Sequence, residues 1–301
     1  MKIPYFPGCA LKTKATNYEM SAISSAKVLN LEMVELPRWN CCGTVYSLVD
    51  DNIMQNLAAV RDLIRVQEIN EEGMMNEETN RLITLCPCCY NTLKRTDMMI
   101  SNDLEKLKTI NTVLDREIDY KGEVQVVHYL EVLKEVGFSK IRDEVKKPLT
   151  EIKIAPYYGC MLLRPKEVGI DDPEDPIILT QVLRSLGSTV IDTPYKTKCC
   201  GSYLTVNEKR AVVEMTYDKL TYCQKAGVEV VAVTCPLCAF NLDNRQAEVK
   251  ELHPDFQTMP ILYFTQFMAL AFGLDEESFG FNSNYIDPKP LLRAKGLLDL
   301  N

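Results

Sequence analysis

Cysteine is the residue type of this 301-residue chain whose spacing could support chemistry, because twelve cysteines occur beside only two histidines. Ten of them belong to one pattern that occurs twice in the same order: a Gly-Cys, a Cys-Cys-Gly and a Cys-Pro-x-Cys. The first copy contains Cys9, Cys41-Cys42-Gly43 and Cys86-Pro87-Cys88-Cys89, and the second contains Cys160, Cys199-Cys200-Gly201 and Cys235-Pro236-Leu237-Cys238. A chain of this length needs no disulfides to fold, so the repeat indicates thiolate ligands for metal.

The kind of metal follows from the number and spacing of the thiols. A structural zinc ion takes four ligands, usually from two Cys-x-x-Cys hairpins. Each copy here offers one Cys-Pro-x-Cys, one vicinal pair and one distant cysteine. Adjacent cysteines chelate one ion poorly, because their side chains diverge along an extended backbone, whereas they suit a polynuclear iron–sulfur cluster. Five thiols exceed the four of an ordinary cubane and favour an unusual cluster; structural zinc and buried inert cysteines are the alternatives.

Alternating strands and helices are expected to position these cysteines. Short apolar runs predict strands at 2–6, 32–36, 81–85 and 124–127, and again at 153–158, 189–192, 228–234 and 261–263. Helical periodicity occurs between them at 18–29, 52–70, 176–186 and 208–225. This order predicts parallel sheets flanked by helices, in which ligands bind at the carboxyl ends of strands. Each cysteine group follows a strand, so the groups of one copy can converge.

The repeat period is too long for a solenoid and indicates duplicated domains. We expect an α/β fold with one cysteine-rich domain at 1–148 and a second at 149–301. A pseudo-twofold axis should relate them, with both cysteine groups facing the interface.

Composition limits the partners and the location of the protein. Acidic residues outnumber basic ones by 42 to 34, which argues weakly against nucleic acid as a partner. No apolar stretch reaches the ~18 residues that a membrane span needs. The N-terminus shows no export signal. We therefore expect a soluble cytoplasmic protein with no membrane span.

The doubled cysteine pattern resembles that of the cysteine-rich CCG domain family. Two such domains in one chain of this length resemble the B subunits of the heterodisulfide reductases of methanogenic archaea, and the resemblance covers nearly the whole chain. It implies one noncubane 4Fe-4S cluster per domain, near the domain interface. Carried over to this sequence, the first cluster takes Cys9, Cys41, Cys42, Cys86 and Cys89, and the second takes Cys160, Cys199, Cys200, Cys235 and Cys238. We call these the first and second cysteine sets.

The resemblance also implies a reaction and partners. The reaction is reduction of the coenzyme M–coenzyme B heterodisulfide to two thiols during methanogenesis. A disulfide takes two electrons and each cluster delivers one, so two clusters facing one pocket could each capture one sulfur. The chain has neither a ferredoxin-type cysteine run nor G-x-G-x-x-G, so electrons must come from partners. The expected partners are the ferredoxin-like C and flavin-containing A subunits of heterodisulfide reductase, with a hydrogenase or formate dehydrogenase module upstream.

Two other functions compete with this interpretation. One is a CCG-domain electron-transfer subunit of a glycolate, lactate or succinate oxidoreductase complex that passes electrons towards quinone. The other is a cluster- or zinc-bearing scaffold that only assembles other subunits.

Two cysteines have no counterpart in the other copy, and both are expected to be spectators. Cys88 lies inside the first Cys-Pro-x-Cys, and alignment with Cys235 and Cys238 favours Cys86 and Cys89 as the ligands. Cys223 lies in a helical stretch and is expected to be a packed core thiol. The first copy also has an acidic insertion at 71–78, interpreted as a solvated surface loop.

A few other residues near the cysteines are weaker candidates. His128 and His253 could deliver a proton to a product thiolate, although a structural role is the more common one for such histidines. Trp39 and Tyr195 could shield the clusters. The cations of Arg38, Lys196 and Lys198 could bind anionic groups of the substrate, although exposed charges at loops are usually solvated.

Overall fold

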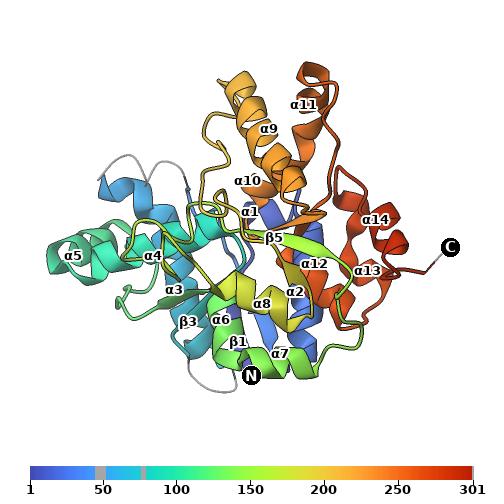
Figure 1. Ribbon diagram of the computed structural model, residues 1–301. Helices are drawn as coiled ribbons and strands as arrows, with labels where there is room; N and C mark the ends of the chain where they lie inside the picture. Colours follow the sequence, from blue (N-terminus) through green and yellow to red (C-terminus); the bar gives the residue numbers. More distant parts are fainter. Residues whose placement is uncertain (45–51, 76–78, 300–301) are drawn as a thin grey trace.

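The computed structural model describes residues 1–44, 52–75 and 79–299. Its first half contains four strands separated by helices (Figure 1). In chain order these are β1 (Lys2–Phe6), α1 (Gly8–Leu11), α2 (Thr16–Val28), β2 (Glu32–Glu35), a 3₁₀ turn (Ile53–Asn56), α3 (Leu57–Glu71), β3 (Arg81–Thr84), α4 (Pro87–Ser101), α5 (Leu104–Val113), β4 (Gln125–His128), α6 (Tyr129–Val136) and α7 (Phe138–Asp143).

The second half repeats this order of strands. It contains β5 (Lys153–Tyr157), α8 (Ile178–Ser185), β6 (Thr189–Val190), α9 (Lys209–Lys225), β7 (Val230–Val233), α10 (Pro236–Ala239), a π-helical turn (Phe240–Asn244), α11 (Gln246–Leu252), β8 (Ile261–Tyr263), α12 (Phe264–Ala271), α13 (Glu276–Phe279), a 3₁₀ turn (Phe281–Ser283) and α14 (Lys289–Ala294). The last helix was not expected, because the segment after Phe279 has little periodicity.

The two sheets have the same topology. The strand order is β2-β1-β3-β4 in the first and β6-β5-β7-β8 in the second, and every pairing is parallel. Apolar residues fill the inner strands almost continuously; all four residues of β7, for example, are buried. Strands with this composition need helices on both faces of the sheet. The predicted α/β fold with two repeated parallel sheets is therefore confirmed.

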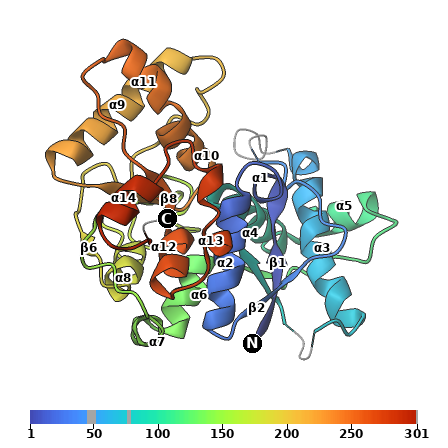
Figure 2. The ribbon, with the colours of Figure 1, turned by 90° about the vertical axis from the view of Figure 1, so that its right-hand side faces the viewer.

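The two halves pack reciprocally. Helix α2, which follows the first strand of the first sheet, lies on α12, which follows the last strand of the second. Correspondingly, α6 follows the last strand of the first sheet and lies on α8, which follows the first strand of the second. Figure 2 shows the two halves side by side, with α2 next to α12. Two equivalent helix contacts of this kind are what a twofold axis between the halves produces.

Equivalent residues also meet at this interface. Tyr129 and Phe264 each begin the helix after a last strand, and their ring centroids lie 6.1 Å apart. Tyr18 stacks on Tyr263 at 4.2 Å and donates a hydrogen bond to the carbonyl oxygen of Leu85. The interface is thus an apolar core that crosses from one half to the other. The boundary at 148/149 stays a prediction.

Candidate metal centres

Each cysteine group lies beyond the carboxyl end of a strand. In the first half, Cys9 lies in α1 after β1, Cys41 and Cys42 lie in the loop after β2, and Cys86 is the residue before α4, after β3. Cys86 has an extended backbone and Pro87 occupies the first position of the helix, where a missing N–H costs nothing. Cys235 and Pro236 have the same roles at α10. The strand-end placement inferred from the sequence is therefore correct.

The thiols of the first set come together in pairs. The sulfurs of Cys9 and Cys41 lie 3.8 Å apart, and those of Cys42 and Cys89 lie 3.6 Å apart. Two thiolates at about 2.3 Å from one tetrahedral metal lie about 3.8 Å from each other. The paired sulfurs therefore fit two ligands of one metal atom. In the second set, Cys199 similarly contacts Cys160 and Cys200, and Cys200 contacts Cys238.

Two glycines identify the equivalent thiols in the two sets. Gly8 has φ +70°, and a Cβ atom placed on it would lie 2.9 Å from the sulfur of Cys89. Gly159 has φ +71°, and a Cβ atom there would lie 3.0 Å from the sulfur of Cys238. Glycine is required at both positions because a side chain would be strained and would displace this sulfur. Cys89, rather than Cys88, is therefore the structural counterpart of Cys238.

The sets extend from the interior to the surface. Cys42, Cys86 and Cys89 are buried, whereas Cys9 and Cys41 are exposed. In the second set Cys200, Cys235 and Cys238 are buried, and Cys160 and Cys199 are half-buried. A group held by either set would thus have a deep face in the core and an outer face within reach of solvent.

Neighbouring thiols prepare some of the sulfurs for metal binding. Hydrogen bonds with Cys41 and Cys89 lower the pKa of Cys42 to about 5. Hydrogen bonds with Cys160 and Cys200 lower the pKa of Cys199 far below its ordinary range. The thiolate is the form of cysteine that binds metal. One thiolate of each vicinal pair is therefore favoured before any metal arrives.

The inner ends of the two sets meet. The thiol of Cys86 lies close enough to that of Cys235, its equivalent in the other half, to lower the pKa of Cys86. Cys88 lies near both of them, and they raise its pKa. Tyr203 is 46% exposed, and it lies close enough to Cys88, Cys160 and Cys235 for their charges to act on its hydroxyl. Tyr203 is therefore a partly exposed residue beside Cys88 and the thiols of the second set.

Two asparagines that follow the Cys-Pro-x-Cys motifs support the sets in different ways. Asn241 donates to the carbonyl oxygen of Cys200 at 3.0 Å, within its own half. Asn91 crosses the interface and donates to the carbonyl oxygens of Met161 and Arg164, at 2.8 Å each, in the segment after Cys160. The sequence places both asparagines beside the motifs, but it does not indicate which loop each one holds.

Both histidines are structural. His128 is fully buried, with Nε2 2.8 Å from the carbonyl oxygen of Leu85 and Nδ1 accepting from the N–H of Leu130. Burial lowers the pKa of His128 to about 4, so its ring is neutral. His253 stacks on Tyr217 at 3.7 Å and bonds to Glu214. Neither arrangement directs a proton towards the thiols.

The charged and aromatic candidates beside the vicinal pairs are mostly engaged elsewhere. Arg38 pairs with Glu68, and the ammonium of Lys196 bonds to both Asp175 and Asp192. Lys198 is exposed. Trp39 packs edge-on against Phe6, and Tyr195 packs edge-on against Tyr222. Of the three suggested cations, Lys198 is thus the one for which the described part of the chain offers no ion pair.

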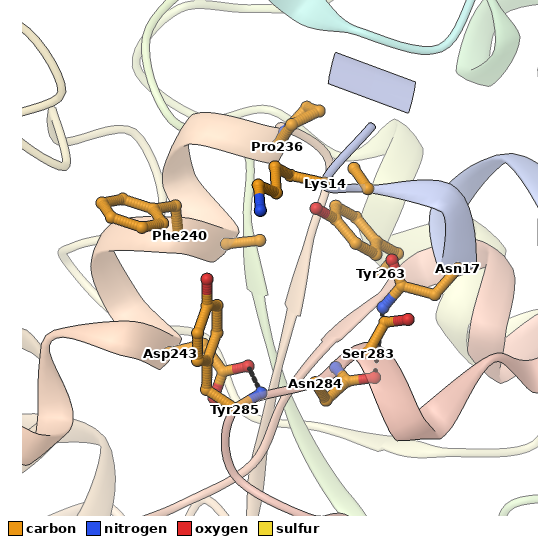
Figure 3. Close-up of a pocket in the computed structure, with 11 residues that line it drawn as sticks. Lys14, Asn17, Pro236, Phe240, Asp243, Tyr263, Ser283, Asn284 and Tyr285 are labelled. Carbon is orange, nitrogen blue, oxygen red and sulfur yellow. Dashed lines mark hydrogen bonds between the residues drawn. The ribbon is translucent and has the colours of Figure 1, made fainter. Parts of the chain in front are cut away.

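A separate pocket lies between the halves. Residues of the first half, including Lys14 and Asn17, line it together with Asp243, Tyr263 and Tyr285 of the second (Figure 3). Its free volume of about 50 Å³ holds a few water molecules but no organic disulfide. Asp243 accepts from the backbone N–H groups of Tyr285 and Ile286 and so anchors the C-terminal segment there.

Two features are absent from the described ranges. In residues 1–44, 52–75 and 79–299, no three His, Cys, Asp or Glu side chains are arranged to hold a single metal ion. Within the same ranges, no helix has the length and apolar composition needed to cross a bilayer.

Known proteins resemble the chain along most of its length. It is 27% identical to the 8-methylmenaquinol:fumarate reductase membrane anchor subunit of Wolinella succinogenes, over 95% of this chain and 98% of that one. It is 28% identical to the B subunit of a ferredoxin/F(420)H(2)-dependent CoB-CoM heterodisulfide reductase of Methanosarcina acetivorans, over 95% and 94%. A protein of Archaeoglobus profundus that is named as similar to heterodisulfide reductase B subunits is 26% identical, over 92% of both chains.

The fold also occurs in a solved structure. A hypothetical protein from Helicobacter pylori superposes with a TM-score of 0.72 over 94% of this chain, at 12% identity. This chain spans 51% of that protein's length, and the likeness concerns the fold alone. The family model of the cysteine-rich domain (CCG) matches residues 3–94 and 154–243, the two segments that contain the two cysteine sets. The chain therefore belongs to the cysteine-rich CCG domain family.

Proposed function

We propose that the two cysteine sets hold two noncubane 4Fe-4S clusters and that the chain is the disulfide-reducing component of a heterodisulfide reductase. Its substrate is then the coenzyme M–coenzyme B heterodisulfide. The contact between Cys86 and Cys235 carries the proposal, because it brings the inner ends of both sets to one place. The similarity to heterodisulfide reductase B subunits along 95% of the chain supports it.

The residues of the chain have three tasks in this function. The first set would hold one cluster and the second set the other; when bound, the two clusters supply one electron each to a disulfide that needs two. The buried thiols keep the deep side of each centre dry, while the exposed Cys9 and Cys41 and the half-buried Cys160 and Cys199 leave the outer side accessible. Lys198, which is exposed beside the second vicinal pair, is positioned to attract an anionic end of the substrate.

Electrons reach these centres from other subunits in the proposed complex. The relatives named as subunits of reductases support a multi-subunit assembly. We propose the ferredoxin-like C and flavin-containing A subunits of a soluble heterodisulfide reductase as the partners, in the cytoplasm, with a hydrogenase or formate dehydrogenase module upstream.

Anaerobic purification of the chain with its native partners tests the proposal. Iron analysis should find about eight iron atoms per chain, four for each cluster. The complex should convert the heterodisulfide to two thiols with reduced ferredoxin or an equivalent donor. Zinc without iron would reject the proposal and favour a scaffold.

A second candidate has its own support. Similarity to the fumarate reductase subunit of Wolinella succinogenes favours an electron-transfer subunit of a complex that exchanges electrons with quinone, including a succinate, glycolate or lactate oxidoreductase. The same preparation distinguishes the two. Oxidation of a menaquinol analogue coupled to reduction of fumarate, with no turnover of the heterodisulfide, would select the second candidate.

A further inference from the structure

Helix α9 carries a lysine on its buried face. Val212, Thr216, Lys219 and Cys223 follow one another at helical spacing, and all four are buried. Lys219 is 5% exposed, at a position where this spacing would otherwise require an apolar residue. Such a position for a lysine calls for an anionic partner, because an ammonium group is costly to remove from water.

No carboxylate among the described residues provides that partner by an ion pair. The ammonium group donates to the carbonyl oxygen of Met215 at 3.0 Å and lies 5.8 Å from the ring centroid of Tyr195. Asp218 acts on it electrostatically, but the Asp218 side chain is exposed to solvent. A carbonyl dipole and an aromatic face compensate only part of a buried full charge.

Three thiols of the second set lie near enough to act on this charge. Burial lowers the pKa of the Lys219 ammonium, and the charges of Cys200, Cys199 and Cys238 act in the opposite direction and favour its charged form. Packing brings them together, because α9 lies against the Cys-Cys-Gly turn. A Cβ atom on Gly201 would lie 3.1 Å from both Met215 and Val212, one and two turns before Lys219. The second set is therefore the anionic centre that this buried ammonium faces.

The equivalent position on the corresponding helix of the first half holds a carboxyl, and the buried cation of that helix, Arg65, is paired with Glu68 and Glu117. Gly43 lies against Ala58 of α3, as Gly201 lies against Met215 of α9. Asp62 lies four residues after Ala58, as Lys219 lies four residues after Met215. Asp62 is fully buried and accepts a hydrogen bond from the N–H of Asn40 at 2.8 Å, next to Cys41. Whatever its protonation, Asp62 adds no positive charge to the first set.

We propose that Lys219 is a positioning residue whose ammonium is the counter-charge of the second cysteine set, so that a redox group held there is easier to reduce than its equivalent in the first set. The inference rests on the proposed clusters. A buried cation stabilises the reduced, more negative form of such a group, and a carboxyl in the same place does not. Electrons would then collect at the second centre, which gives the pair a direction.

The test is a redox titration followed by EPR on the complete chain with its partners. Lys219→Met removes the charge and keeps the length of the side chain. It should lower the equilibrium constant for reduction of the second centre at least tenfold, which corresponds to a fall of about 59 mV in its one-electron reduction potential. The potential of the first centre should stay unchanged. Lys219→Arg should restore most of the difference. The matched control is Lys225→Met, which removes an exposed charge from the same helix.

The outcomes separate this inference from the proposed function. Two iron clusters with unchanged potentials in Lys219→Met, or an equal shift at both centres, would overturn the inference and leave the proposed function intact. Loss of the second cluster in Lys219→Met but not in Lys219→Arg would support the counter-charge. Loss in both variants would show a packing role and overturn it. A wild-type chain without iron would instead reject the proposed function.

Discussion

At the residue scale, the cysteines divide into structural equivalents and two exceptions. Cys89 and Cys238 lie against equivalent glycines, whereas Cys88 contacts both Cys86 and Cys235. Cys223 is buried in α9, and burial raises its pKa to about 11. No neighbouring thiol acts on the pKa of Cys223, so this residue lies apart from both cysteine sets.

Serine variants test whether the two exceptions are spectators. Cys223→Ser should leave iron content and activity nearly unchanged, with a stability loss of about 1 kcal/mol from replacing a buried thiol by a hydroxyl. Cys88→Ser should also keep both clusters, because Cys86 and Cys89 match the second set. Iron analysis and EPR on both variants give the answer. The disappearance of one cluster in Cys88→Ser would mean that Cys88 is a ligand.

His128 makes stability depend on pH. Burial lowers the pKa of His128 to about 4, whereas a histidine in the unfolded chain has a pKa of about 6.5. Between these values the unfolded state binds one more proton, so stability decreases as the pH falls, by up to about 1.4 kcal/mol per unit. His128→Gln should lose this dependence. Urea unfolding of both proteins between about pH 7 and pH 5 measures it; parallel pH profiles would show that His128 does not contribute.

The sequence patterns indicated which thiols come together in the fold, but they did not indicate which other residues lie around those thiols. Repetition of Gly-Cys, Cys-Cys-Gly and Cys-Pro-x-Cys marked ten positions that the structure brings to two places. No repeated pattern marked Tyr203, Lys219 or Asp62. The sequence around a single charged or aromatic residue does not show whether its side chain faces solvent or a thiol. For Lys219 the helical spacing with Val212 and Cys223 was the available indication.

At the element scale, the order of strands and helices was predictable, while some lengths were not. The strand expected at 189–192 comprises Thr189 and Val190 alone, because the chain then turns towards the vicinal pair. The helix expected at 52–70 begins with a 3₁₀ turn before α3. Part of the acidic insertion, at 76–78, lies outside the described residues. Helix α14 packs its one buried residue, Leu292, without a long apolar stripe, so periodicity could not reveal it.

Asn91 of α4 contacts the segment after Cys160, and this contact predicts that a helix of the first half positions a loop of the second. Asn91→Ala leaves the carbonyl oxygens of Met161 and Arg164 without their donor, at about 1–3 kcal/mol for each buried group. Although Asn91 belongs to the first half, the variant should lose iron mainly from the second set. Amide exchange of residues 160–170 should increase. Asn241→Ala, which acts within the second half, is the control.

A different pattern of iron loss in Asn91→Ala would contradict this prediction. Iron loss confined to the first set, with unchanged exchange at residues 160–170, would show that α4 does not position the Cys160 segment.

At the scale of the whole molecule, the halves are joined by two equivalent helix contacts, α2 with α12 and α6 with α8. Separating them would expose the faces of α2 and α12, including Tyr18 and Phe264. Exposed apolar faces of this size mark an unstable or aggregating fragment. The fragments 1–148 and 149–301 should therefore fold poorly alone and form a stable complex when co-expressed. Circular dichroism and urea unfolding are the measurements; cooperative unfolding of either fragment alone would show independent domains.

In the proposed function, the same reciprocal packing makes the two sets act together. Cys86 and Cys235 approach each other across the interface, so the inner ends of both sets lie in one place. A substrate that takes two electrons needs both one-electron centres within reach. Losing either centre should then stop turnover, even though the other remains intact.

Single changes in the vicinal pairs test this pairing. Cys42→Ser and Cys200→Ser each replace a buried thiol by a hydroxyl that stays protonated near neutral pH and binds iron weakly. Each variant should lose or alter the cluster of its own set and keep about four irons in the other. Heterodisulfide reduction should fall at least a hundredfold in both, because neither remaining centre can complete the two-electron step. Anaerobic iron analysis, EPR and turnover on the same samples provide the measurement. A variant with one cluster and undiminished turnover would mean that a single centre is sufficient and that the meeting of the two sets at Cys86 and Cys235 serves stability alone.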